Sequence, residues 1–288
     1  MNFFVEPFTS NEFMMLALIA GSLVSLTCAI AGTFVVLRGL AFVGDALAHG
    51  LLPGIAIAIL LGFSGVIGAA VGAGVMMGGV GLVQRKLRLS GDTAVGLLFV
   101  GMLSLGVIIT SRSDEFVGDL TRILFGQLLG VNSTDVVWQV IALVVVALIA
   151  YACRRPFLLL TIDEGLTSTS GFSVRLFHNL LLVVVGITVV ASFQTVGTLL
   201  VLGMLVAPAA TGALFARRIE SMMIIAGVVG ILSTYTGLLL SYHFDLAAGA
   251  SIVLVAVAIF ALSATLHEIR SAQRRHDELP HAHGHVHL

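Results

Sequence analysis

Asp45 and His49 carry a carboxylate and an imidazole within an almost uncharged stretch of the sequence. Residues at positions i and i+4 of a helix lie on the same face, so a helix would direct both groups the same way. Such a pair is suited to binding one divalent cation. An ionisable side chain within a bilayer is costly and usually faces a pathway, a partner or an ion. We therefore expect Asp45 and His49 to be metal ligands; the alternative is that each hydrogen-bonds a neighbouring helix.

The composition is that of a membrane protein. Of the 288 residues, 58% are hydrophobic and 10% are charged, whereas soluble domains average about 25% charged residues. The 32 glycines fit close packing of helices in lipid, where small residues let backbones approach one another. The net charge of −1 gives no indication of nucleic-acid binding.

About nine apolar segments predict an all-α bundle that crosses the membrane eight or nine times. Several of them approach the ~20 residues that a helix needs to cross the hydrocarbon core. The second segment contains Asp45 and His49, and Pro53 within it removes a backbone donor and predicts a kink. The segments are residues 13–37, 41–62, 64–84, 93–111, 135–153, 177–193, 196–215, 220–242 and 247–266.

The basic residues predict how these segments are oriented. Two predicted spans separate each basic cluster from the next, so all the clusters can lie on one side of the membrane. By the positive-inside rule that side is the cytoplasm. With nine spans, the N-terminus is then outside and the C-terminus in the cytosol. The clusters are Arg85-Lys86-Leu-Arg88, Arg154-Arg155 with Arg175, Arg217-Arg218, and Arg270 through Arg274-Arg275.

The segment between the fifth and sixth spans is long for a connection. We expect a short helix around Asp163 that Gly171 terminates, lying beside the membrane. It is either a connecting loop or a docking element for a soluble partner. The chain contains no Gly-x-x-x-x-Gly-Lys-[Ser/Thr] motif, so any ATP used for transport must be hydrolysed by another chain.

Two further groups of side chains could meet metal. His243 and Asp245 fall at the predicted outer end between the last two spans, where they form either an outer gate or merely an exposed pair in a loop. The C-terminal residues 276–288 form a tail distinct from the domain 1–275, with five histidines in thirteen residues. A flexible tail of this kind chelates borderline metals, and it is either an accessory metal-binding element in the cytosol or idle. Its alternating histidines are His281, His283, His285 and His287.

The segment Gly44-Asp45-Ala-Leu-Ala-His49-Gly-Leu-Leu-Pro53-Gly54 resembles the signature Gly-Asp-Ala-Leu-Ser-His-Ala-x-Leu-Pro-Gly of the zinc/manganese/iron class of bacterial ABC importer permeases. The resemblance covers about residues 13 to 266. Two positions depart from the pattern, since Ala48 replaces a serine and Ala247 stands where proline is common. Further matches, in the family's order, are Asp92-Thr-Ala-Val-Gly96, Leu124-Phe125-Gly126, Asp163-Glu-Gly-Leu, Gly171-Phe-Ser-Val-Arg175, Val196-Gly197-Thr-Leu-Leu-Val, Ala207-Pro208-Ala-Ala-Thr211 and Asp245-Leu-Ala-Ala-Gly249.

The resemblance implies a type-II-like permease of the bacterial inner membrane, in which two copies form the pathway among membrane lipid. A cytosolic ABC ATPase dimer would drive it, and an extracytoplasmic metal-binding protein would deliver the metal. The family's pathway site maps onto Asp45 and His49. Its coupling helix maps onto the segment near 163–171, with Asp163, Glu164, Gly165 and Gly171.

The resemblance also implies that ATP hydrolysis takes place in a separate subunit and that no cofactor is permanently bound. The transported ion would be Zn²⁺ or Mn²⁺, with Fe²⁺ a further candidate. A mixed oxygen and nitrogen ligand set suits these ions, whereas Mg²⁺ and Ca²⁺ prefer oxygen alone. The alternative function is a stand-alone secondary transporter that exchanges metal for protons at the same pair.

Overall fold

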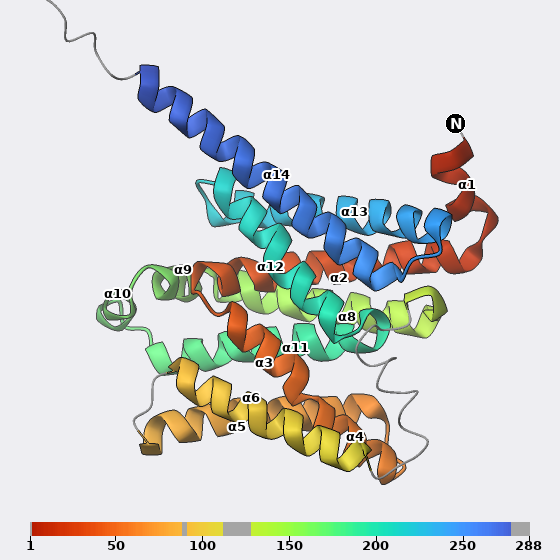
Figure 1. Cartoon of the computed structure of the whole chain (residues 1–288). Helices are drawn as coiled ribbons and strands as arrows, with labels where there is room; N and C mark the ends of the chain where they lie inside the picture. Colours follow the sequence, from red (N-terminus) through yellow and green to blue (C-terminus); the bar gives the residue numbers. More distant parts are fainter. Residues whose placement is uncertain (1, 88–90, 112–127, 278–288) are drawn as a thin grey trace, which may run out of the picture.

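The computed structural model describes residues 2–87, 91–111 and 128–277, and every regular element within these ranges is helical (Figure 1). This confirms the all-α prediction for the described ranges. The elements are α1 (Asn2–Ser10), α2 (Glu12–Leu37), α3 (Ala41–Gly50), α4 (Leu52–Leu60), α5 (Gly65–Leu87), α6 (Gly91–Thr110), η1 (Leu128–Gly130), α8 (Ser133–Ala152), α9 (Arg154–Ile162), α10 (Glu164–Thr169), α11 (Val174–Val196), α12 (Thr198–Phe215), α13 (Ile219–Phe244) and α14 (Ala248–Asp277).

Helix α2 lies at the centre of the bundle, where it packs against α8, α11, α12 and α13 (Figure 1). Small residues bring the neighbouring backbones close. A Cβ added at Gly32 would overlap the carbonyl oxygen of Leu205 in α12, and one at Gly21 would lie 2.6 Å from the methyl group of Thr234 in α13. The hydroxyls of Ser25 and Thr234 are 2.9 Å apart and join α2 to α13. Small and hydroxylated residues of this kind hold helices together in lipid.

The predicted spans are present as helices. In the described part of the chain, eight helical stretches are long and apolar enough to cross a membrane, and Leu200–Phe215 is a shorter apolar helix. Each of the nine expected segments corresponds to one of these stretches. The prediction of eight or nine spans is therefore confirmed.

The helix breaks follow local residue chemistry. The second span is divided into α3 and α4 at Leu51, with Pro53 in the first turn of α4, as the missing donor of proline requires. Gly197 has φ +78° and separates α11 from α12. Pro208, by contrast, lies inside α12 without ending it, since neighbouring helices in a membrane bundle tolerate proline.

Four helical regions of the described chain are missing from the sequence-based prediction. They are α1, η1, α9 and the last turns of α14, which runs to Asp277 rather than to residue 266. Apolar runs mark where a chain crosses lipid, whereas a helix continues into polar sequence for as long as its backbone bonds are favourable. The hydrophobic pattern therefore located the spans and missed these helices.

The ends of the helices divide between two sides of the molecule (Figure 1). Segments α9 and α10, the connection from α12 to α13 and the C-terminal end of α14 all lie on one side. Helix α1, the connection from α13 to α14 and the start of α8 lie on the other. The end of α5 and the start of α11 also lie on the first side (Figure 1). The described basic residues belong to these helix ends, which agrees with the arrangement expected from their spacing along the chain.

Candidate functional site

Asp45 and His49 face the same way from α3, as their spacing predicts. His49 Nδ1 lies 3.3 Å from Asp45 Oδ1 and 3.2 Å from the carbonyl oxygen of Asp45. The Asp45 side chain is 27% exposed and that of His49 is 19% exposed. The two groups are thus next to each other and only partly covered, so a third species can still reach them.

Aromatic and glycine contacts fix the helix that carries this pair. The ring of His49 meets Phe99 of α6 edge-on at 5.4 Å, and Phe99 also packs against Phe42 at 6.0 Å. On another face, a Cβ added at Gly44 would lie 2.9 Å from the Leu205 side chain of α12. The orientation of α3 is therefore set by α6 and α12 together.

A small cavity of about 90 Å³ lies against α3, bounded by α3, α5, α6 and α11. It is lined by Val43, Ala46 and Leu47, which lie on the face of α3 opposite to Asp45 and His49. His178 of α11 lines it too, and its Nδ1 is buried without a hydrogen-bond partner. The His178 ring is thus only partly exposed and borders a cavity between helices.

The described residues hold no cluster of three or more His, Cys, Asp or Glu side chains that could bind a metal ion. Among the described residues, Asp45 and His49 are thus a pair and not part of a larger group of such side chains. A divalent transition metal takes four or more ligands. A metal ion held by this pair would therefore need further ligands.

The segment around Asp163 forms the short helix expected from the sequence. Asp163 Oδ1 accepts a hydrogen bond from the Leu166 amide at 3.0 Å and so caps α10. Gly171 has φ +82° just after the helix ends, the left-handed conformation that favours glycine. Gly165 leaves room for the cap, since a Cβ there would lie 2.7 Å from Asp163 Oδ1. Local sequence therefore determines this element.

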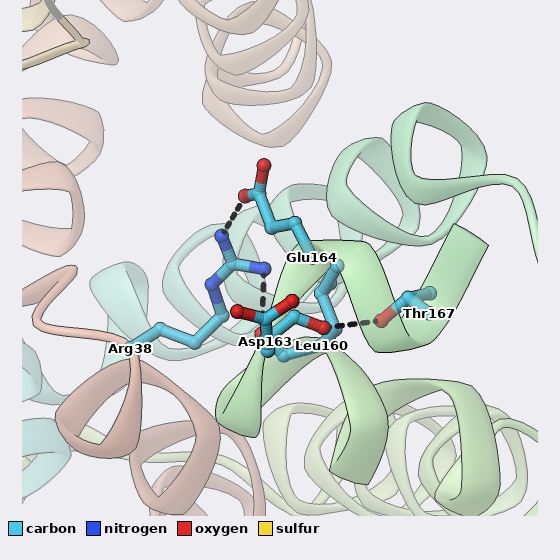
Figure 2. Close-up of polar contacts among 5 residues, drawn as sticks. All are labelled: Arg38, Leu160, Asp163, Glu164 and Thr167. Atoms are coloured by element: carbon cyan, nitrogen blue, oxygen red, sulfur yellow. Dashed lines mark hydrogen bonds and ion pairs between the residues drawn. The ribbon is translucent and has the colours of Figure 1, made fainter. Parts of the chain in front are cut away.

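Sequence reasoning missed the contact that holds this segment to the bundle. Arg38, at the end of α2, donates a hydrogen bond to the carbonyl oxygen of Leu160 at 3.2 Å and pairs with Glu164 Oε1 at 2.8 Å (Figure 2). Arg38 and Glu164 are 126 positions apart in the chain. No local pattern signals such a pair, although an arginine that ends an apolar helix is a cue to look for a partner.

His243 and Asp245 lie at the junction of α13 and α14, on the side of the molecule away from α10 (Figure 1). Asp245 is exposed, and its φ of 52° ends α13 in the left-handed conformation. The ring of His243 meets that of Tyr242 edge-on at 5.3 Å. The histidines at positions 281, 283, 285 and 287 lie outside the described residues.

A larger cavity of about 700 Å³ lies away from Asp45 and His49, between α5, α8 and α11. Its lining is mostly apolar, and Gln139 is a buried polar group on its wall. Gln139 Nε2 donates to the Ala191 carbonyl at 2.7 Å and to Thr195 Oγ1 at 3.0 Å, joining α8 to α11. The cavity brings no metal-ligating group to the Asp45–His49 pair.

Comparisons with known proteins agree with this architecture. A sequence model of the ABC 3 transport family matches residues 10–267. The manganese transport system membrane protein MntC of Halalkalibacterium halodurans is 37% identical over 264 residues, which cover 91% of this chain and 90% of that protein. A probable iron transport system membrane protein of Haemophilus influenzae is 36% identical, covering 90% of this chain and 95% of that protein. The solved structure of PsaBC from Streptococcus pneumoniae in complex with Fab matches with a TM-score of 0.82 at 33% identity, covering 90% of this chain and 94% of that chain.

Proposed function

Because the chain belongs to the ABC 3 transport family, we propose that it is the membrane permease of an ATP-driven importer of a divalent transition metal ion, with Asp45 and His49 as ligands in the pathway. The names of its relatives favour Mn²⁺ or Fe²⁺, since they include a manganese and an iron transport protein. Zn²⁺ remains compatible with a carboxylate and an imidazole. The observation that carries the proposal is the adjacent, partly accessible carboxylate and imidazole on a helix of a membrane span.

The spacing of the two ligands suits one metal ion. Two atoms bound about 2.0–2.2 Å from an ion, at an angle of roughly 90–110°, lie about 2.8–3.6 Å apart. The distance from His49 Nδ1 to Asp45 Oδ1, 3.3 Å, falls within this range. The carboxylate also lowers the barrier for a dication in a passage of low dielectric constant.

A second copy of the chain would complete the ligand set. The described part of one copy offers two ligands, and a twofold axis beside α3 would bring two carboxylates and two imidazoles together. The exposed Phe42, one turn before Asp45 on the neighbouring face, supplies apolar surface for such a seam. We therefore propose that the working permease is a homodimer.

The proposed orientation follows the basic clusters. The side of the molecule with α9, α10 and the end of α14 would face the cytosol. There α10 would contact the cytosolic ATPase, and the tail 276–288 would serve as an accessory metal-binding element. His243 and Asp245 would face outward, where an extracytoplasmic binding protein would dock, and this outer-gate role stays a prediction.

The proposal is tested by metal transport in proteoliposomes that contain the chain with its ATPase. Asp45→Asn keeps the shape of the side chain and removes its charge, and His49→Ala removes the imidazole. We expect each variant to lose metal uptake by at least about tenfold while ATP hydrolysis continues. Glu12→Gln, at an exposed carboxylate in the first turn of α2, is the matched control and should transport normally. Unchanged uptake by Asp45→Asn, or full transport driven by a proton gradient without any ATPase, would contradict the proposal.

A further inference from the structure

Arg38 joins two helices of the proposed coupling segment. Its guanidinium, 12% exposed, bonds to the carbonyl of Leu160 near the end of α9 and to the carboxylate of Glu164 at the start of α10 (Figure 2). The last carbonyls of a helix have no partner within it and attract cations. One side chain therefore binds both sides of the corner at Asp163. Movement of that corner must either carry the guanidinium with it or break these bonds.

The same residue forms the start of the connection to the metal-binding helix. The Arg38 amide bonds back to Phe34 and the Leu40 amide to Val35, at 3.0 and 2.8 Å. Gly39 between them has φ +65°, so α2 ends in a compact, hydrogen-bonded turn. Helix α3 begins at the next residue, Ala41, and Asp45 follows within its second turn. The guanidinium and the proposed metal ligands are thus connected by a short, hydrogen-bonded turn and the first turn of α3.

Aromatic rings hold α9 beside the same end of α2. Phe157 of α9 meets Phe34 of α2 at 5.1 Å and Phe177 of α11 at 6.4 Å, both edge-on. Phe34 and Phe157 are each 1% exposed, so this contact keeps the segment near α2 whether or not the polar contacts form. The Arg38 contacts decide where the corner at Asp163 lies relative to the turn before α3.

Helix α3 has space into which it can shift. The cavity of about 90 Å³ lies behind it, on the face away from Asp45 and His49. That volume is about that of three water molecules. A well-packed interior holds few such voids. A small displacement of α3 towards His178 would fill this one and move both ligands together.

We propose that Arg38 is a positioning residue that transmits the displacement of α9 and α10 to the helix bearing Asp45 and His49. The proposal rests on the function proposed above and adds the mechanical link between the ATPase contact and the metal site. Two sites coupled through one element change each other's equilibrium. Loss of Arg38 should therefore uncouple ATP hydrolysis from metal movement while leaving both partial activities present.

The experiment measures metal transported per ATP hydrolysed by the complete reconstituted complex, and metal affinity with and without trapped ATP. Arg38→Gln and Glu164→Gln each remove the ion pair. Arg270→Gln, at an exposed arginine of α14 on the same side of the molecule, is the matched control. We expect the ratio to fall by about fivefold or more in both variants, with ATP hydrolysis retained. The shift in metal affinity on trapping ATP should also shrink, and the control should behave as the wild type.

A second variant separates coupling from simple destabilisation. The exchange Arg38→Glu with Glu164→Arg restores the ion pair but not the bond to Leu160. It should therefore recover part of the loss in metal transported per ATP hydrolysed. A wild-type ratio in Arg38→Gln would overturn the inference. The inference would also be overturned if Arg38→Gln lost ATP hydrolysis and metal transport equally and the exchange Arg38→Glu with Glu164→Arg recovered neither. If the wild type itself shows no ATP-dependent transport sensitive to Asp45→Asn, the proposed function fails instead, and the two failures are thereby distinguished.

Discussion

Replacement of Gly54 by alanine would disturb the contact that sets α4 against α5. A Cβ at Gly54 would overlap the carbonyl oxygen of Gly68 and lie 2.9 Å from the Cα of Gly72. Carbon atoms in good contact are about 3.5–4.0 Å apart, so the helices would have to separate by roughly 0.6 Å or more. The obstructing atoms belong to the backbone, so no side chain can rotate away to make room.

The expected effect is the difference between two contributions to the free energy of unfolding. Overpacking of a tight contact costs about 1–3 kcal/mol, whereas alanine in place of glycine gains up to about 1 kcal/mol in a helix. Because the added Cβ would overlap a backbone carbonyl, the overpacking cost of Gly54→Ala should lie near the upper end of this range. We therefore expect the free energy of unfolding to fall by about 1–2 kcal/mol in total. Gly74→Ala in α5 is the matched control. A Cβ there has no neighbour within 4 Å, so it should be neutral or stabilise by up to about 1 kcal/mol.

The assay is the free energy of unfolding of each purified variant in mixed micelles, from titration with a denaturing detergent while helix content is followed. Gly68→Ala should be destabilised as well, because its Cβ would overlap the carbonyl of Gly54 and lie 2.6 Å from Ala58 Cβ. The double variant should lose less free energy of unfolding than the sum of the two single losses, since both changes separate the same two helices. Equal stability of Gly54→Ala and Gly74→Ala would refute the reasoning and show that α4 and α5 have slack at this contact.

Two further predictions concern a buried bond and the C-terminal tail. Gln139→Leu keeps the approximate volume and removes the bonds to Ala191 and Thr195. It should lower the free energy of unfolding by about 1–2 kcal/mol in the same titration, and an unchanged value would mean that α8 and α11 associate without these bonds. Deletion of residues 278–288, which begins after the end of α14, should reduce metal binding by the purified chain while transport continues. Loss of transport on deletion would instead make the tail a release site.

The sequence by itself determined the features that depend on near neighbours in the chain. Asp45 and His49 share a face because four positions make about one helical turn, and the structure places them 3.3 Å apart. Asp163 caps α10, and Gly171 lies just beyond its end, because both features depend on a few adjacent residues. The spans were recognisable because lipid requires long apolar helices whatever lies beside them.

Only the tertiary structure decided which distant residues meet. Arg38 pairs with Glu164, which lies 126 positions later in the chain, and the sequence contains no periodicity that relates them. His178 lines a cavity behind α3 because of how α3, α5 and α11 pack. The same packing decides where a glycine is needed. A Cβ added at Gly54 would meet the backbone of α5, whereas one added at Gly74 has no neighbour within 4 Å. Local pattern thus specifies helices and the groups they carry, whereas contacts between helices depend on the packing of the whole bundle.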